Sequence, residues 1–250
     1  MKFNILIFLV VSTFYAQEIR TPFTLNTDVF IGIDTINNIY YLKDNTLYKK
    51  NETKIISYSN IHLGELTQVD ISNSLKIVLF YKDFNTVIIL DNELNELTNT
   101  LNFNTLINNT ISFVGATNNT NLWLFSENNT TLYLWNYQTK KINTTTVLQD
   151  HFNYKMACSN QKNSWLISNT KAIQYNQYGS FINQLNLTNI KNAVAYKNGL
   201  IYQIDKQLFY YSDHETKTIP FKNNIEIVDF NIQNNWLYYF DGKLINKIEL

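Results

Sequence analysis

Several residue types are scarce in this chain of 250 residues, and each scarcity excludes a class of protein. Arginine occurs once, at Arg20, although paired hydrogen bonds to phosphates and base edges depend on arginine more than on any other residue. The 20 basic residues are balanced by 20 acidic ones, so a basic excess is missing as well. We therefore expect no nucleic-acid partner.

The lone cysteine, Cys158, cannot form a disulfide within the chain. Its segment, residues 154–158, lacks the electropositive surroundings that activate a thiol, so we predict a buried structural thiol on an inner strand. The three histidines, His62, His151 and His214, include no pair with metal-ligand spacing. A glycine-rich phosphate loop and a Cys-x-x-Cys pair are also missing. We therefore expect neither a metal site nor a cofactor.

Glycine and proline, the usual turn residues, occur only 6 and 2 times. Asparagine is abundant instead, and it tolerates left-handed backbone and closes turns. Asparagine pairs at 37–38, 118–119, 128–129 and 234–235 lie between apolar runs, where we expect turns. No stretch has apolar residues at helical spacing, whereas 17 tyrosines and 16 phenylalanines favour strands. The composition therefore predicts an all-β protein.

One apolar run begins after a lysine near the N-terminus and covers residues 5–11. This order is typical of a secretory signal peptide, and the run is shorter than the roughly 20 residues that span a bilayer. We predict a signal peptide over residues 1–16, cleaved after Ala16 or alternatively after Ser12. The competing interpretation is a buried first strand. The ending at residues 14–17 resembles exported proteins of flavobacteria, so we expect a periplasmic or secreted protein without a membrane span.

A hairpin pattern of two short apolar strands returns along the chain at a spacing of about 40 residues. Its clearest copies cover residues 39–48, 77–89, 122–134, 200–210 and 236–245. Repeated units of this size, made of short strands separated by polar turns, are typical of a β-propeller. Counted by the second strand, the units run over 30–68, 69–112, 113–153, 154–189, 190–225 and 226–250.

The last unit holds only three strands, while the segment 18–25 precedes the first inner strand and has no unit of its own. We predict that this segment becomes the outer strand of the last unit, where Pro22 suits an edge. Residues 17–250 would then form one domain, a six-bladed β-propeller whose ring is closed by the N-terminal strand. Five or seven blades are the alternatives.

The repeat resembles six-bladed propellers in general, over nearly the whole chain after residue 16. The resemblance lies in the pattern alone. The Gly-His and Trp-Asp signature of WD-type repeats, the aspartate box of sialidase-like propellers and the kelch glycine pair are all missing. No catalytic residue can therefore be transferred from those families.

Carboxylates near the inner strands are the first candidate site. Asp34, Asp70 and Asp229 fall in the first, second and last units, which are neighbours in a closed ring, so we expect them near the channel. Converging carboxylates can bind a cation or act as acid and base. The alternative is that they only solubilise a wet channel. Asp150 and His151, in the link between two blades at the rim, are the second candidate pair.

Three tryptophans, Trp123, Trp165 and Trp236, fall on second strands at what we interpret as equivalent positions. We therefore predict that they pack between blades. Trp135, on a third strand, is the least constrained of the four.

The loops contain no recognised nucleophile, metal cluster or phosphate cradle, and in propellers function resides in the loops. We therefore predict a monomeric, exported, non-catalytic binding or scaffolding module that engages a protein or peptide partner at the cell envelope. A secreted glycan-acting hydrolase or lyase, with carboxylates at the channel mouth, is the alternative. A third hypothesis is a sensor that binds a small ligand or sugar without turnover.

Overall fold

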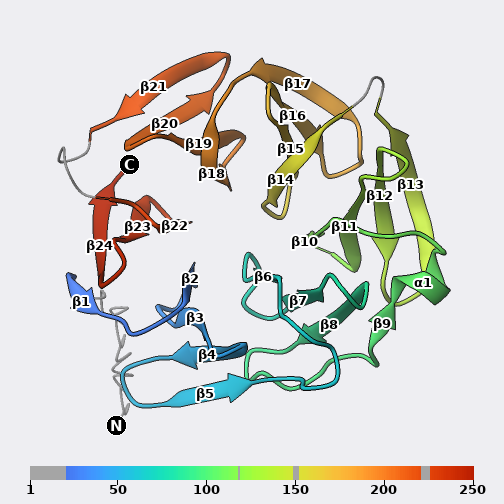
Figure 1. The fold of residues 1–250 in the computed structure, drawn as a ribbon, viewed down its shortest axis with the longest axis horizontal. Coiled ribbons are helices and arrows are strands. Elements are labelled where there is room, and N and C mark those ends of the chain that lie inside the picture. Colours follow the sequence, from blue (N-terminus) through green and yellow to red (C-terminus); the bar gives the residue numbers. More distant parts are fainter. Residues whose placement is uncertain (1–20, 118, 149–151, 221–225) are drawn as a thin grey trace, which may run out of the picture.

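The computed structural model describes residues 21–117, 119–148, 152–220 and 226–250. Its strands form six antiparallel sheets of four strands each, arranged around a central axis like the blades of a propeller (Figure 1). The predicted all-β, six-bladed propeller is therefore confirmed, and the alternatives of five or seven blades are wrong. The predicted signal peptide lies outside the described residues.

Five blades consist of four consecutive strands, with the inner strand first. The first three blades are β2 (Val29–Ile33), β3 (Ile39–Lys43), β4 (Thr46–Lys50), β5 (Ile55–Tyr58); β6 (Gln68–Asp70), β7 (Ile77–Tyr81), β8 (Thr86–Leu90), β9 (Leu101–Asn102); and β10 (Phe113–Ala116), β11 (Asn121–Ser126), β12 (Thr131–Asn136), β13 (Lys141–Val147). The next two are β14 (Tyr154–Ser159), β15 (Asn163–Ser168), β16 (Lys171–Asn176), β17 (Phe181–Asn186); and β18 (Ile190–Tyr196), β19 (Gly199–Ile204), β20 (Gln207–Ser212), β21 (Glu215–Ile219). The sixth blade joins β22 (Asp229–Gln233), β23 (Trp236–Phe240) and β24 (Leu244–Glu249) to β1 (Phe23–Thr24), and the short helix α1 (Phe103–Leu106) follows β9.

The strand β1 closes the ring. Phe23 pairs with Ile245 and Thr24 with Leu244, which makes β1 the outermost strand of the sixth blade (Figure 1). Closure by the N-terminal strand is thus confirmed for these residues. Pro22 directly precedes β1, and residues 18–20 of the predicted closing segment lie outside the described part of the chain.

The middle strands of the blades carry the apolar core. Every residue of β7 and β8 is buried, because each blade lies between two neighbours and both faces of its sheet are covered. This is why these strands read as continuous apolar runs. An apolar cluster fills each of the six junctions between blades. The outer strands β13 and β17 instead alternate between exposed and half-buried residues.

The four tryptophans correct part of the sequence interpretation. Trp123 and Trp165 are fully buried at the third position of β11 and β15, as predicted. Trp236 is the first residue of β23 and only half-buried, so its predicted equivalence to the other two is wrong. Trp135 is fully buried in the junction between the second and third blades, where its ring meets Phe103 edge-on at 5.3 Å. It is therefore not the least constrained tryptophan.

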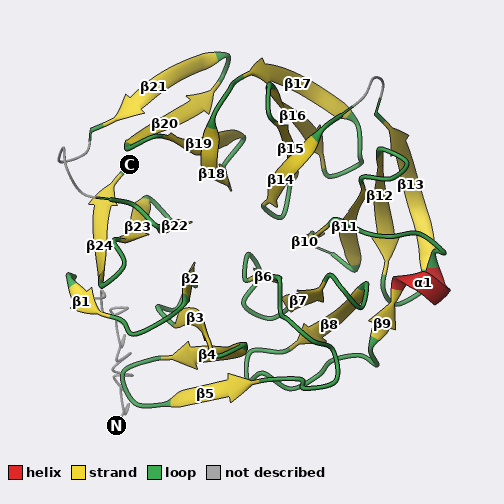
Figure 2. Ribbon diagram, in the orientation of Figure 1, coloured by secondary structure: helices red, strands yellow, loops and turns green. Residues whose placement is uncertain are grey.

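The turns divide between two faces of the disc, because successive strands of a blade are antiparallel. The connection face carries the loops between blades and the turns between second and third strands. The turn face carries the other turns. Figure 2 draws the loops and turns between the strands in green. Asn37 and Asn234, in two of the predicted asparagine turns, have positive φ angles of 64° and 55°. Gly242 also has a positive φ, of 93°. No helix among the described residues is long and apolar enough to cross a membrane.

Candidate binding channel

The inner strands β2, β6, β10, β14, β18 and β22 surround a central channel (Figure 1). The channel holds two cavities, a chamber of about 830 Å³ and an entrance of about 280 Å³. Both are lined by Gln68, Phe113 and Ala157, so they adjoin at these residues. We call the larger cavity the turn-face chamber, because turn residues such as Asn160 and Lys197 line it, and the smaller one the connection-face entrance.

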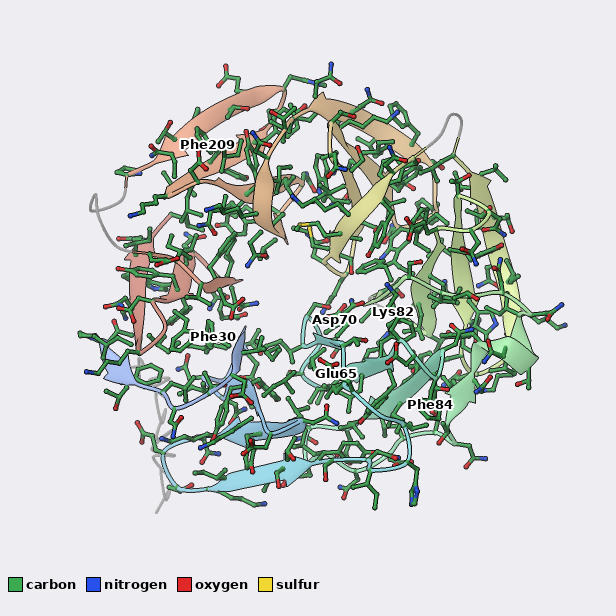
Figure 3. The ribbon with its side chains drawn as sticks, in the orientation of Figure 1. Phe30, Glu65, Asp70, Lys82, Phe84 and Phe209 are labelled. Atoms are coloured by element: carbon green, nitrogen blue, oxygen red, sulfur yellow. The ribbon has the colours of Figure 1, made fainter. Side chains whose placement is uncertain are left out.

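Asp70 borders the turn-face chamber and lies beside the central opening in Figure 3. Its Oδ2 accepts the backbone N–H of Ala116 on the third blade at 2.7 Å, and its Oδ1 accepts the N–H of Ser72 at 2.8 Å. Two residues earlier, the Gln68 amide accepts the N–H of Val114 at 3.3 Å and donates to its carbonyl. Gln68 and Asp70 therefore tie the second blade to the inner strand of the third.

Asp229 serves the junction between the sixth and first blades in the same way. Its Oδ2 accepts the N–H of Phe30 at 3.3 Å, and Oδ1 of Asn231 accepts the N–H of Ile33 at 3.4 Å. Burial raises the pKa of the Asp229 carboxyl, and the Phe30 hydrogen bond partly opposes the shift. Gly32 permits the close approach of the Asn231 side chain to β2, because an added Cβ would lie 2.3 Å from Cγ of Asn231.

Asp34 organises the turn between β2 and β3. Its carboxylate accepts the backbone N–H groups of Ile36 at 3.0 Å and Asn38 at 2.9 Å, the Asn38 amide and the Tyr40 hydroxyl. With 3% of its surface exposed, Asp34 borders neither cavity. Burial, followed by the Asp34 charge, raises the pKa of the Tyr40 hydroxyl.

The structure thus does not gather the three predicted carboxylates at one wall. Of the three, only Asp70 lines a cavity, and Asp34 and Asp229 are engaged inside the fold. Asp150 and His151 lie outside the described residues. A chemical role for any of these candidates, the three carboxylates or the pair Asp150 and His151, stays a prediction.

Cys158 lies on the inner strand β14 and borders the chamber. Burial raises the pKa of its thiol to about 12, so the thiol is protonated at neutral pH and is a poor nucleophile. His62 lies in an exposed loop of the connection face, and His214 in the turn between β20 and β21. The described ranges contain no group of three His, Cys, Asp or Glu residues that could hold a metal ion.

Sequence reasoning missed a buried lysine between the second and third blades. The Lys76 ammonium donates to the carbonyl of Thr117 at 2.8 Å and to that of Asn119, and lies 5.5 Å from the centre of the Tyr137 ring. Burial lowers its pKa to about 8, and the Asp70 charge partly opposes the shift. Its partners lie on another blade, so only its place before the apolar run of β7 was visible in the sequence.

Sequence reasoning also missed the amide-rich side of the chamber. The amide wall consists of four side chains of the sixth blade, Asn231, Gln233, Asn234 and Asn235. Beside it lie Trp236 and Glu249, which are paired across β23 and β24, and Lys197 of the fifth blade. An abundance of asparagine hid this group, because its members look like ordinary turn residues in the sequence.

No family model matches the chain, and no curated protein matches it. Solved structures similar to it include the catalytically inactive virginiamycin B lyase from Staphylococcus aureus with quinupristin, with a TM-score of 0.62, 10% identity and coverage of 92% of this chain and 98% of that one. The streptogramin B lyase structure has a TM-score of 0.59, 12% identity and coverage of 91% and 97%. The Pan2 WD40 domain of Neurospora crassa has a TM-score of 0.59, 11% identity and coverage of 88% and 75%. At these identities the likeness establishes the propeller fold alone.

Proposed function

We propose that this protein is an exported, non-catalytic binding module that engages a protein or peptide partner at the cell envelope. Export rests on the predicted signal peptide over residues 1–16. Propellers of similar fold occur both in a mitotic checkpoint complex and in lyases, so the fold does not choose between binding and turnover. The choice rests on this chain's own surface and carboxylates.

Exposed apolar and charged side chains of two loops on the connection face carry the proposal. We call this group the loop surface and define it as Ile61, Glu65, Lys82 and Phe84, the last three of which lie in one sector of the ring in Figure 3. Ile61 is 87% exposed and Phe84 46% exposed. Exposed apolar side chains flanked by charges are typical of protein-interaction sites.

The loop surface is held in place by hydrogen bonds. Nδ2 of Asn45 donates to the carbonyl of Gly64 at 2.8 Å, and its Oδ1 accepts the N–H of Leu66 at 2.7 Å. The Phe84 ring lies against Gly64, where an added Cβ would come within 3.2 Å of it. Lys82, whose N–H donates to Thr67 at 3.1 Å, also lines the connection-face entrance. Loops fixed in this way lose little entropy when a partner binds.

The carboxylates favour binding over glycan turnover. Hydrolysis of glycosides needs two carboxyl groups about 5–9.5 Å apart in an open cleft. Asp34, Asp70 and Asp229 instead accept backbone N–H groups, and two of them border neither cavity. Among the candidates from the sequence, the hydrolase or lyase alternative keeps the pair Asp150 and His151, which lies outside the described residues.

Affinity capture from native envelope extract tests the proposal. We expect the wild-type protein to enrich a specific protein, and the Ile61→Ser/Phe84→Ser variant to lose it. A matched control, Leu75→Ser/Tyr178→Ser, removes two apolar side chains that are each 67% exposed on the turn face and should retain it. A partner kept by the loop variant, or the absence of any enriched protein, would contradict the proposal.

Export is tested separately, by the intact mass of the protein from the exporting host. A mass that still includes residues 1–16 would contradict export.

A further inference from the structure

The turn-face chamber opens on one side of the channel. Gln161, in a turn of the fourth blade, donates across the mouth to the carbonyl of Ser72 on the second blade at 2.9 Å. This bridge narrows the mouth on that side. Apart from Ser72, the exposed lining residues lie on the other side, at Lys197 of the fifth blade and at Asn234, Asn235 and Glu249 of the sixth. A ligand therefore enters along the amide wall.

The amide wall presents hydrogen-bonding groups that the described residues do not use. Oδ1 of Asn235 accepts the Tyr196 hydroxyl at 3.1 Å, which leaves its Nδ2 group without a partner in the described ranges. Oδ1 of Asn234 accepts a hydrogen bond from Nε2 of Gln233 at 3.3 Å. The Asn234 Nδ2 group and the side-chain oxygen of Gln233 therefore also have no partner in the described ranges. The wall thus offers both donors and acceptors.

The rest of the chamber combines branched apolar side chains with a few charged ones. Ile31, Ile33, Val69 and Ile71 line it on the first and second blades. Three charged residues line the chamber: Asp70, whose carboxylate accepts the N–H groups of Ser72 and Ala116, and the pair Lys197 and Glu249. Lys197 and Glu249 balance each other in charge at the mouth, and the described residues contain no salt bridge to either. This balance disfavours a strongly charged ligand. The volume of about 830 Å³ lies within the range of small-molecule sites.

Two of the inner strands, β2 and β10, offer little to an extended peptide. A peptide that adds to a sheet edge binds through backbone hydrogen bonds. At two blade junctions, inner-strand N–H groups are already bonded by side chains of the neighbouring blade: those of Phe30 and Ile33, and those of Val114 and Ala116. The unused polar groups of the chamber include the side-chain amides of the amide wall and the Ser159 hydroxyl.

We propose that the turn-face chamber binds a neutral polyhydroxylated ligand, a short uncharged oligosaccharide. A hydroxyl group both donates and accepts, so it matches a wall that offers both, while the isoleucine side receives the C–H face of a sugar ring. This site lies on the face opposite the loop surface. It is therefore separate from the proposed protein-binding function.

Trp236 provides a reporter for this site. It lines the chamber and is half-buried, whereas Trp123, Trp135 and Trp165 are fully buried. Acrylamide should therefore quench Trp236 fluorescence far more than that of the other three. The Trp236→Phe variant should lose most of the quenchable signal, which checks this assignment.

Acrylamide quenching and calorimetry with maltohexaose, cellohexaose, xylohexaose and N-acetylchitohexaose test the proposal. We expect at least one of these sugars to bind with a Kd below about 1 mM and to lower the quenching constant about twofold. The Gln233→Ala/Glu249→Ala variant should bind about tenfold more weakly, because two hydrogen-bonding groups are removed. Gln207→Ala, an exposed amide outside the chamber, is the matched control and should bind as the wild type does.

Three outcomes would overturn the proposal. They are failure of all four sugars to bind, unchanged affinity in the Gln233→Ala/Glu249→Ala variant with an unchanged melting curve, and protection of Trp236 only by an uncharged blocked Gly-Ser hexapeptide. The Ile61→Ser/Phe84→Ser variant should bind the sugar normally. Loss of the protein partner and loss of the sugar site are thereby distinguishable.

Discussion

Two kinds of contact join the blades, one apolar and one polar. The apolar contacts can be predicted from the sequence far better than the polar ones. Between the middle strands the contacts are apolar, as around the fully buried Trp165 between the fourth and fifth blades. Between the inner strands they are polar, as where Asp70 and Asn231 accept N–H groups of the next blade. The apolar contacts provide most of the stability, because buried area scales with side-chain size. The polar contacts fix how adjacent blades meet, because each needs one particular partner atom.

The largest expected effect on stability follows from removing an apolar contact between blades. Trp165→Ala should lower the free energy of unfolding by about 3–5 kcal/mol, because a large fully buried side chain leaves a cavity. Trp236→Ala, at the half-buried start of its strand, should cost less than half as much. Denaturant unfolding measures both. Equal losses at the two positions would refute the distinction between them.

A smaller effect should follow from breaking one polar contact. Asp70→Ala leaves the N–H of Ala116 without its acceptor, which should cost about 2 kcal/mol. Asp70→Asn keeps an oxygen in the same place and should retain most of the stability. Chemical denaturation of the two variants, compared with wild type, measures the difference. If both variants were as stable as wild type, the hydrogen bond would contribute nothing to the junction.

The smallest effect is a pH dependence that arises at Lys76. Its pKa is lowered to about 8 in the fold from 10.5, so between these values the unfolded chain binds more protons than the folded one. Stability from this group therefore rises with pH in that window, and the full cost of burying the charge is present below about pH 8. The rise should amount to about 1 kcal/mol between pH 7.5 and 9.

The Lys76→Met variant should lose this rise, whereas Lys162→Met, at an exposed position, should keep it. Cys158 acts in the opposite direction at higher pH, because its thiol has a raised pKa of about 12 and stays protonated in the fold. The comparison is therefore made as the difference between wild type and variant at each pH. An identical slope in wild type and Lys76→Met would contradict the burial of a charged lysine.

The sequence predicted the propeller well because the middle strands are buried on both faces. Runs such as 77–81 and 87–90 remain apolar throughout, so they mark each blade without knowledge of its neighbours. Trp236 was misinterpreted because its place depends on register. It is the first residue of β23 and pairs with Gln233 beside the turn, whereas Trp165 is the third residue of β15 and lies opposite Cys158. A short shift along a strand thus separates a core position from a channel rim.

The candidate site was predicted less well. The inner-strand position of Asp70 and Asp229 could be read from the repeat, but their partners could not. The amide wall and Lys76 were not predicted at all, because asparagine and lysine also occur wherever a surface is wet. Only their neighbours distinguish them from solvated residues.

By itself, the sequence determined the propeller repeat, the order of the blades and the segment that closes the ring, because burial between sheets demands apolar runs at regular spacing. It favoured six blades over five or seven, and the structure decided that number. The tertiary structure alone decided what the polar side chains do. Asp70 meets Ala116, 46 residues away, and Asn231 meets Ile33, 198 residues away. Contacts of that kind leave no local pattern, because a hydrogen bond depends on where two atoms lie and not on the residues beside them.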